Sequence, residues 1–447
     1  MAAAVPGGVG AGGADGGAST PPQPVGRIHP QPWMTAPETV AVLEALAADG
    51  AEVRFIGGCV RDSLLKRPVR DIDIALAVPP TGVMALLRRA GIKAIPTGID
   101  HGTITAVVGA QCFEITTLRV DVETFGRRAR VAFTDDWIAD AARRDFTFNA
   151  LSCTVDGEVY DFFGGLEDLG HGRVRFVGDA SERIGEDVLR LLRYFRFYAH
   201  YGRPPPDVAA LAACRAYAEK LPMLSGERVR VEIFRTLMAT DPADVFALMR
   251  AQDVLAHVLP EANGIERLKM LSWIDSRAVR IDSVAPDPVR RLAALLTTDA
   301  DGAGLIAERL KLSNRQRDRL VALAAGPPVH PELLALAVVR LLRSLGRETV
   351  RDLALLGWAG ELAQTARLTR GRNTRWIELL HGIDQWQPVV FPLMGRDALA
   401  LGIPRGPGIG ALLRQVEDWW EEGGYAADRT ACLAQLRLLA GAAGRPR

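Results

Sequence analysis

The chain has 447 residues, enough for several domains, and its formal net charge of +1 excludes proteins that bind nucleic acid through a strongly basic overall charge. Its five cysteines show neither CxxC nor histidine-paired spacing, which argues against a zinc site or a disulfide framework. The sequence contains no apolar run of membrane-spanning length, and the Gly/Ala/Pro-rich segment 1–30 lacks the features of a signal peptide. We therefore expect a disordered tail at 1–30 and a cytoplasmic protein that does not enter a membrane.

Residues 54–76, RFIGGCVRDSLLKRPVRDIDIAL, contain the first informative pattern. Apolar residues predict a strand over 53–56, a glycine pair follows, and the next residues predict a helix over 60–65. A glycine pair alone is more often a turn. In this order, however, backbone N–H groups at the start of the helix can face phosphate oxygens, and Arg61 adds a positive charge near them.

A pair of aspartates, Asp71 and Asp73, lies on the run that predicts a strand over 72–76. Side chains two residues apart in a strand point to the same face, so the carboxylates converge while Ile72 and Ile74 pack against the other face. Two carboxylates on one face suit Mg²⁺, which takes its other ligands from water and substrate phosphates. An isolated Asp-x-Asp is more often a solvated strand end, but the ordered set of motifs indicates nucleotidyl transfer.

This arrangement resembles the nucleotidyltransferases of the DNA polymerase β superfamily and, more closely, the class II CCA-adding tRNA nucleotidyltransferases and bacterial poly(A) polymerases. The pattern GGxVRDxLL…RPxxDxD is matched at Gly57, Gly58, Val60, Arg61, Asp62, Leu64, Leu65, Arg67, Pro68, Asp71 and Asp73. The resemblance is strong to about residue 240 and looser beyond it. It implies CTP, ATP and tRNA as partners, with the tRNA bound through its 3′ end and its acceptor/T-arm region.

The spacing of apolar residues separates a sheet-forming part of the chain from a helical part. Strands of one small sheet are predicted over 53–56, 72–76, 103–108, 113–118 and 152–155. From residue 181 onward the periodicity is helical, and strands followed by helices indicate an α+β fold with a small mixed sheet. With the resemblance, the expected domains are a catalytic head (31–178), a helical neck that recognises the base (179–240), and a helical body and tail that bind tRNA (241–447).

Glu114 lies on the strand predicted over 113–118. By the resemblance, it is the third catalytic carboxylate and faces the aspartate pair from a neighbouring strand, which pairing would bring within about 5 Å. The alternative is an exposed glutamate on an edge strand.

The segment 120–132 is polar, rich in arginine and interrupted by a glycine, so we expect a loop. In the family this region is a flexible loop linked to the addition of the final A. Arg127, Arg128 and Arg130 can contact the RNA end or the triphosphate, and a solvated loop is an equally good alternative. The loop favours complete CCA addition over CC-only addition.

The segment 143–151, RRDFTFNAL, matches the family element RRDFTxNAL. The resemblance implies that Asp145 and Asn149 hold the ribose diol and that Arg144 holds phosphate, roles that suit their hydrogen-bonding groups. Contact with the 2′-OH distinguishes RNA precursors from DNA precursors. A helix cap formed by Asp145 is compatible with the same role.

The segment 184–197 predicts one amphipathic helix, with an apolar face made of Ile184, Val188, Leu191, Leu192 and Phe195. Asp187 and Arg190 are three residues apart, which would place them side by side, as in an ordinary surface ion pair. With the earlier motifs present, the family element EDxxR fits better. The resemblance then implies that Asp187 and Arg190 read the incoming base, with Arg193 on the same face.

Hydrogen bonding explains how such a pair can select two bases. Cytosine and adenine each present an amino donor beside an unprotonated ring nitrogen, so an aspartate can accept and an arginine can donate. Uracil and guanine would leave both protein groups mispaired. Because each unpaired buried polar group costs about 1–3 kcal/mol, a protein can select C and A without a nucleic-acid template.

Two features of the helical remainder suit RNA. A candidate patch for the RNA backbone consists of Arg367, Arg370, Arg372 and Arg375. Residues 406–410, GPGIG, open a predicted helix whose N–H groups can meet a phosphate. Solvated loops and helix faces are equally good alternatives for both features.

Together these patterns predict a template-independent nucleotidyltransferase that adds C, C and A to tRNA 3′ ends, with Asp71 and Asp73 holding two Mg²⁺ ions. A poly(A) polymerase would share nearly every head motif, but the sequence after Thr103 lacks the basic strand associated with that branch. A non-catalytic RNA-binding protein is disfavoured because both aspartates and Arg144 are intact.

Overall fold

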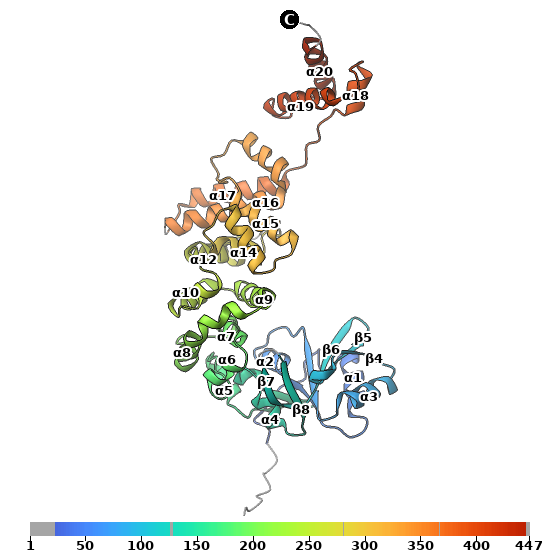
Figure 1. Ribbon diagram of the computed structural model, residues 1–447, viewed down its shortest axis with the longest axis vertical. Helices are drawn as coiled ribbons and strands as arrows, with labels where there is room; N and C mark the ends of the chain where they lie inside the picture. Colours follow the sequence, from blue (N-terminus) through green and yellow to red (C-terminus); the bar gives the residue numbers. More distant parts are fainter. Residues whose placement is uncertain (1–22, 126–127, 280, 366, 444–447) are drawn as a thin grey trace, which may run out of the picture. The chain divides into compact units, whose positions relative to one another are not determined.

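The computed structural model describes residues 23–125, 128–279, 281–365 and 367–443 (Figure 1). The chain divides into two compact units, one ending at Asp187 and including 203–210, the other made of 188–202 and 211–447. In the described part of the chain, none of the helices combines the length and apolarity that a membrane crossing needs.

The first unit is built on a mixed sheet, which has eight strands among the described residues, in the order β1-β10-β9-β2-β3-β6-β5-β4. Their bounds are β1 (Gly26–Arg27), β2 (Val53–Ile56), β3 (Ile72–Leu76), β4 (Lys93–Gly98), β5 (Thr103–Val108), β6 (Gln111–Thr117), β9 (Ser152–Thr154) and β10 (Glu158–Tyr160). Strands β3 and β6 pair in parallel, and the other described pairs of this sheet are antiparallel. The predicted α+β class with a small mixed sheet is confirmed.

The expected loop at 120–132 is wrong, because β7 (Arg119–Phe125) and β8 (Arg128–Phe133) form an antiparallel hairpin. Both segments alternate apolar and polar residues, a strand pattern that their many charges concealed. All five predicted strands are present, with ends that differ by up to two residues. The sequence reasoning missed β1, β4 and β10, which are short or, in β4, contain Pro96. Strand β1 lies within the expected disordered tail at 1–30, so that expectation is wrong for residues 26–27, and residues 1–22 lie outside the described residues.

Short helices accompany the sheet. They are α1 (Pro37–Ala47), α2 (Gly58–Leu64), α3 (Pro80–Arg89), η1 (Ile99–His101), α4 (Trp137–Ala142), η2 (Thr147–Asn149), α5 (Gly165–His171) and α6 (Ala180–Glu186). Helices α1 and α3 lie against each other (Figure 1). The alternating residues of the central strands place Phe55, Ile74 and Phe113 in the core, so the polar residues between them face away from it.

The rest of the described chain is helical, as predicted. Its elements are α7 (Leu189–Tyr201), α8 (Val208–Tyr217), η3 (Ala218–Met223), α9 (Gly226–Leu237), α10 (Pro242–Ala251), α11 (Leu255–Val258), α12 (Ile265–Trp273), the π-helix η4 (Ile274–Ala278), α13 (Pro288–Leu295), α14 (Ala300–Arg309), α15 (Asn314–Ala325), α16 (Ala335–Gln364), α17 (Arg370–Gln385), α18 (Gly395–Ala400), α19 (Pro407–Glu422) and α20 (Arg429–Ala443).

Local signals explain the start of one of these helices and a bend in another. Helix α15 begins with a capping box made by Ser313 and Gln316, and α16 bends at Gly346, whose φ is 80°. The last three helices bury a small apolar core of their own, made of Leu393, Ala398, Val416, Trp420, Cys432 and Leu436.

Candidate active site

The glycine pair forms the turn between β2 and α2. Gly57 has φ 66° and ψ −119°, a conformation that residues with a side chain rarely adopt. A Cβ at Gly57 would lie 3.3 Å from Nη1 of Arg144 and 3.6 Å from the carbonyl oxygen of Asn149. The glycine therefore lets the RRDFTFNAL segment approach the turn, which brings two distant sequence motifs together.

Asp73 and Glu114 lie directly beside each other on the paired strands β3 and β6. Their neighbours Ile72, Ile74 and Phe113 are buried, so the two carboxylates share the opposite face of the sheet. The alternative for Glu114 is wrong in expecting an edge strand, because β6 lies between β3 and β5, but the Glu114 side chain is exposed as that alternative expected.

The three acidic residues repel one another. Asp71 is exposed immediately before β3. Burial raises the pKa of Asp73 to about 6; repulsion from Glu114 and Asp71 adds to the rise, while Arg144 and Arg61 oppose it. A bound cation would relieve this repulsion.

A hydrogen-bond network joins α2 to η2. Arg61 donates from Nη1 to Oδ1 of Asn149 (2.6 Å), and Asn149 donates from Nδ2 to Oδ1 of Asp145 (3.0 Å). Asp145 also accepts from the N–H of Phe146 (2.9 Å), and Arg61 bonds Asp62 through Nε and Nη2 (2.9 and 3.0 Å). Arg61 thus contacts protein groups here, so its expected contact with phosphate stays a prediction, as does the ribose contact of Asp145 and Asn149.

Arg144 is positioned by Asp140, a residue that the sequence reasoning missed. Asp140 is buried on α4 and accepts from Nη2 of Arg144 (3.1 Å), from Nε and Nη2 of Arg143 (2.9 and 2.8 Å), and from the N–H of Arg119 (3.2 Å). Burial by itself would raise the pKa of Asp140, but Arg144, Arg143 and the Arg119 N–H together hold it below its usual range. The missed signal was its i, i+3 and i, i+4 spacing to the two arginines.

The expected single helix over 184–197 is wrong. Helix α6 ends at Glu186, Asp187 is extended with φ −150° and ψ 106°, and α7 begins at Leu189. Gly185 weakens the last turn of α6, which is where the helical spacing argument fails. Asp187 belongs to the first unit, whereas Arg190 and Arg193 lie on α7 in the second, so base reading by these residues stays a prediction.

The expected RNA-binding arginines fall into three groups. Arg127 lies outside the described residues, and Arg128 is the first residue of β8. Arg372 pairs with Glu361 (Nε to Oε1, 2.7 Å) and Glu332, and Arg375 also pairs with Glu332 (3.4 Å).

Arg367 and Arg370 instead line a surface hollow of the second unit. The helix expected after 406–410 is present as α19, and its contact with phosphate stays a prediction.

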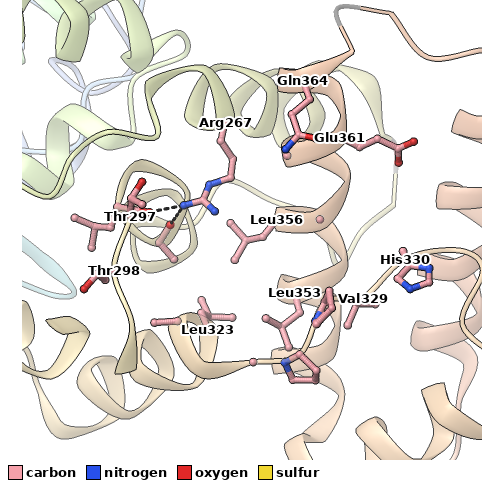
Figure 2. Close-up of a pocket in the computed structure, with 18 of the residues that line it drawn as sticks. Arg267, Thr297, Thr298, Leu323, Val329, His330, Leu353, Leu356, Glu361 and Gln364 are labelled. Carbon is pink, nitrogen blue, oxygen red and sulfur yellow. Dashed lines mark hydrogen bonds between the residues drawn. The ribbon is translucent and has the colours of Figure 1, made fainter. Parts of the chain in front are cut away.

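Figure 2 shows another cavity of the second unit, with a volume of about 600 Å³. Arg267 donates to the carbonyl oxygens of Ala294 (Nε, 2.8 Å) and Ala293 (Nη2, 2.9 Å), and Glu361 accepts from Nε1 of Trp376 (2.7 Å). Arg267 and Glu361, two charged residues of the described lining, are thus already bonded to protein groups, and Glu361 also pairs with Arg372.

Two family models match the chain. The poly A polymerase head domain matches residues 53–175, and the probable RNA and SrmB-binding site of polymerase A matches residues 207–265. The first match contains the glycine turn, the three carboxylates and the RRDFTFNAL segment. Proteins with this polymerase β-like nucleotidyltransferase head use a divalent metal ion.

Curated proteins and solved structures extend the likeness over most of the chain. It is 34% identical over 411 residues to the Homo sapiens CCA tRNA nucleotidyltransferase 1, mitochondrial, covering 89% of each. It is 36% identical over 233 residues to the CCA-adding enzyme of Leuconostoc citreum, covering 51% of this chain and 55% of that one. The structure of the Bacillus stearothermophilus CCA-adding enzyme in complex with CTP superimposes with a TM-score of 0.72 at 26% identity, covering 91% of this chain and 98% of that one. This chain therefore belongs to the family of class II CCA-adding enzymes and poly(A) polymerases.

Proposed function

We propose that this chain adds C, C and A, one after another, to the 3′ ends of tRNA from CTP and ATP, without a template and with release of pyrophosphate. The observation that carries the proposal is the pairing of Asp73 with Glu114 on the face reached by the charges of Arg61 and Arg144. A carboxylate cluster next to cationic groups is what a nucleoside triphosphate with bound metal requires.

Asp71 and Asp73 are the residues that would hold the metal, which we propose to be Mg²⁺, with Glu114 completing the cluster. Among the described residues, no group of three or more His, Cys, Asp or Glu side chains is arranged to hold a metal by itself. Mg²⁺ takes several of its ligands from water and substrate phosphates, so two aspartates can be the main ligands that the protein supplies. When bound, it would activate the terminal 3′-OH and stabilise the leaving pyrophosphate.

The nucleotide would be held by residues from three segments. Arg144, fixed by Asp140, would contact the triphosphate, and the turn at Gly57-Gly58 would present backbone N–H groups to it. Asp145 and Asn149 would receive the ribose, since their side chains are already fixed relative to each other by a 3.0 Å hydrogen bond. Pre-positioned groups of this kind lower the cost of binding.

We further propose that Asp187, Arg190 and Arg193 read the base, with Asp187 accepting from the amino group of C or A and Arg190 donating to the ring nitrogen. The interruption at Asp187 supports this, because an extended residue between two helices is not held in a helical turn and can adjust to bases of two sizes. Arg127, Arg128, Arg372 and Arg375 keep a proposed role in RNA contact.

The proposed domains are the segment 1–30, a catalytic head (31–178), a neck (179–240) and an RNA-binding body and tail (241–447). The match to an RNA-binding model at 207–265 crosses the proposed boundary between neck and body. We propose action in the cytoplasm. Because the human relative is called mitochondrial, cell fractionation with an antibody to the chain is the test.

A poly(A) polymerase is the second candidate, since the head matches a model described as a poly A polymerase head domain. The deciding experiment uses purified protein, Mg²⁺ and tRNA transcripts that end at the discriminator base. Each NTP is supplied singly and in mixtures, and the products are sequenced at the 3′ end. We expect termination after C-C-A and no product from Asp73→Ala; a long A tail with ATP alone would identify a poly(A) polymerase, and RNA binding without extension a binding protein.

A further inference from the structure

A surface hollow of about 760 Å³ lies in the second unit, between α12 with η4 and the region where α16 ends and α17 begins. Four cationic side chains line it: Lys269, Arg277, Arg367 and Arg370. Asp241 is the one carboxylate among the described lining residues. Its volume lies within the range of small-molecule sites, and its charge suits an anionic ligand.

Two cations of this hollow form exposed ion pairs, Lys269 with Asp244 (Nζ to Oδ1, 3.5 Å) and Arg277 with Asp241, and the other two are open to a ligand. Among the residues that the structure describes, no carboxylate forms an ion pair with Arg367 or Arg370, and both side chains are exposed. The pair between Arg277 and Asp241 (2.8 Å) is more than half exposed on both sides, so a phosphate can replace Asp241 at little cost. By contrast, Arg372 and Arg375 in the same arginine-rich segment are paired with Glu332.

An exposed tryptophan stands at the same hollow. Trp273 ends α12 and is 44% exposed, whereas Trp358 and Trp376 of the same unit are 2% and 1% exposed. Nearly half of the Trp273 side chain is therefore open to solvent beside four cationic side chains. Aromatic rings flanked by basic side chains are the usual platform for bases of single-stranded nucleic acid.

We propose that this hollow binds one unstacked nucleotide of the RNA substrate, with the base stacked on Trp273 and its flanking phosphates on Arg367, Arg370, Arg277 and Lys269. The proposal rests on the proposed function, which supplies the RNA. An RNA chain fits better than a protein segment, because the wall combines several cations with a single flat aromatic face and polar side chains of Asn373 and Thr374.

The test compares four variants with the wild-type chain in binding to tRNA that lacks CCA, by fluorescence anisotropy at several salt concentrations. We expect Trp273→Ala to weaken binding about 5- to 100-fold at an unchanged salt slope, and Trp273→Phe to restore most of it. We expect Arg367→Ala combined with Arg370→Ala to lower the slope of log K against log salt by about 1.5. Arg315→Ala, an exposed arginine of the same unit that lies outside the hollow, is the matched control.

Nucleotide addition is measured with the same variants. We expect a higher KM for tRNA and an unchanged kcat in Trp273→Ala and in the Arg367→Ala, Arg370→Ala double variant, and wild-type values in Arg315→Ala. The inference is overturned if Trp273→Ala and the double variant bind tRNA like the wild-type chain, or if Trp273→Ala weakens only the binding of free CTP and ATP. If the wild-type chain adds no nucleotide but the variants still lose tRNA affinity in the expected pattern, the inference stands and the proposed function fails.

Discussion

At the residue scale, Asp73 shows that the site is built for a ligand rather than for stability. Its pKa of about 6 lies above the usual aspartate value of 3.8, so its ionisation costs folding free energy. This cost to the free energy of folding is absent at a pH below the pKa of the unfolded chain. It grows as the pH rises from that pKa to the pKa of the folded protein, and it is complete above about pH 6. We expect Asp73→Asn to stabilise the metal-free protein at pH 7.5 by up to about 3 kcal/mol and to abolish nucleotide addition.

Thermal unfolding in EDTA at pH 3.5 and 7.5 checks this prediction. The gain should be present at pH 7.5 and absent at pH 3.5. Glu158→Gln, which makes the same charge change on the exposed strand residue of β10, should show no such gain. An Asp73→Asn protein that melts below the wild-type chain at pH 7.5 would contradict the repulsion described here.

Asp140 is the second residue whose role can be isolated. Replacing it with Asn removes the charge that holds Arg144 and Arg143, so we expect kcat/KM for CTP and ATP to fall about 10- to 100-fold while tRNA affinity stays unchanged. Breaking a buried ion pair should also cost about 3–5 kcal/mol of stability. Steady-state kinetics at 20 °C and urea unfolding measure the two effects separately.

Asp136→Asn is the control for Asp140, because Asp136 caps the same helix by accepting from the N–H groups of Ile138 and Ala139 (2.8 and 3.2 Å) without touching Arg144. Because asparagine caps a helix about as well as aspartate, it should lose at most about 0.5 kcal/mol of stability and keep its nucleotide kinetics. Equal losses of kcat/KM in both variants would mean that helix α4, rather than the Asp140 charge, matters.

Residue spacing along single elements predicted part of this site. The alternation at 71–74 predicted that Asp71 and Asp73 share a face, whereas Glu114 was expected near them from the family resemblance. The structure places Glu114 beside Asp73 by pairing β3 with β6. The Asp140 contacts were missed, and the bonds from Arg61 to Asn149 join residues 88 apart in the chain. No local pattern encodes such a distant partner, because it depends on how the chain folds back.

At the element scale, the turn between β2 and α2 makes a further prediction. Gly57→Ala should lose stability, since φ 66° is strained for alanine, and should lose activity, since its Cβ would lie 3.3 Å from Arg144. Gly50→Ala is the matched control, because φ is 82° there and nothing lies within 4 Å of the added Cβ. Both variants should lose about 1 kcal/mol, and nucleotide addition should fall only in Gly57→Ala; equal activity would contradict the close approach.

Elements with a clear apolar periodicity were predicted from the sequence. Elements without such a pattern, which depend on pairing or packing with other segments, were not. Strands β2, β3 and β5 were recognised from the sequence because one or both of their faces are apolar. The hairpin β7–β8 is dense in charge, so its alternation was concealed. The break between α6 and α7 at Asp187 was not predicted, because the apolar positions on either side keep helical spacing although Asp187 itself is not helical.

At the scale of the whole molecule, the change from strands to helices correctly predicted the order of the chain but not its division into units. Residues 188–202, which include α7, belong to the second unit, but residues 203–210 belong to the first unit again. Periodicity reports the face that each element buries, whereas the partner of that face is set by packing among distant elements.

A buried charge network makes the last prediction, which concerns the second unit as a whole. Arg291 is fully buried and donates to Asp275 through Nε (3.0 Å) and Nη2 (2.6 Å), and to the carbonyl oxygens of Leu237 and Ala239 (2.6 and 2.8 Å). The network thereby joins the end of α9 to η4 and α13. Asp275→Ala would leave the guanidinium buried without its counter-charge, which should cost about 3–5 kcal/mol.

Urea unfolding followed by tryptophan fluorescence measures this loss, because the buried rings of Trp358 and Trp376 lie in the same unit. Asp318→Ala removes an exposed carboxylate that pairs with Arg317 (2.9 Å) and should cost less than about 1 kcal/mol. If Asp275→Ala loses no more stability than Asp318→Ala, the buried network does not hold the helices of this unit together.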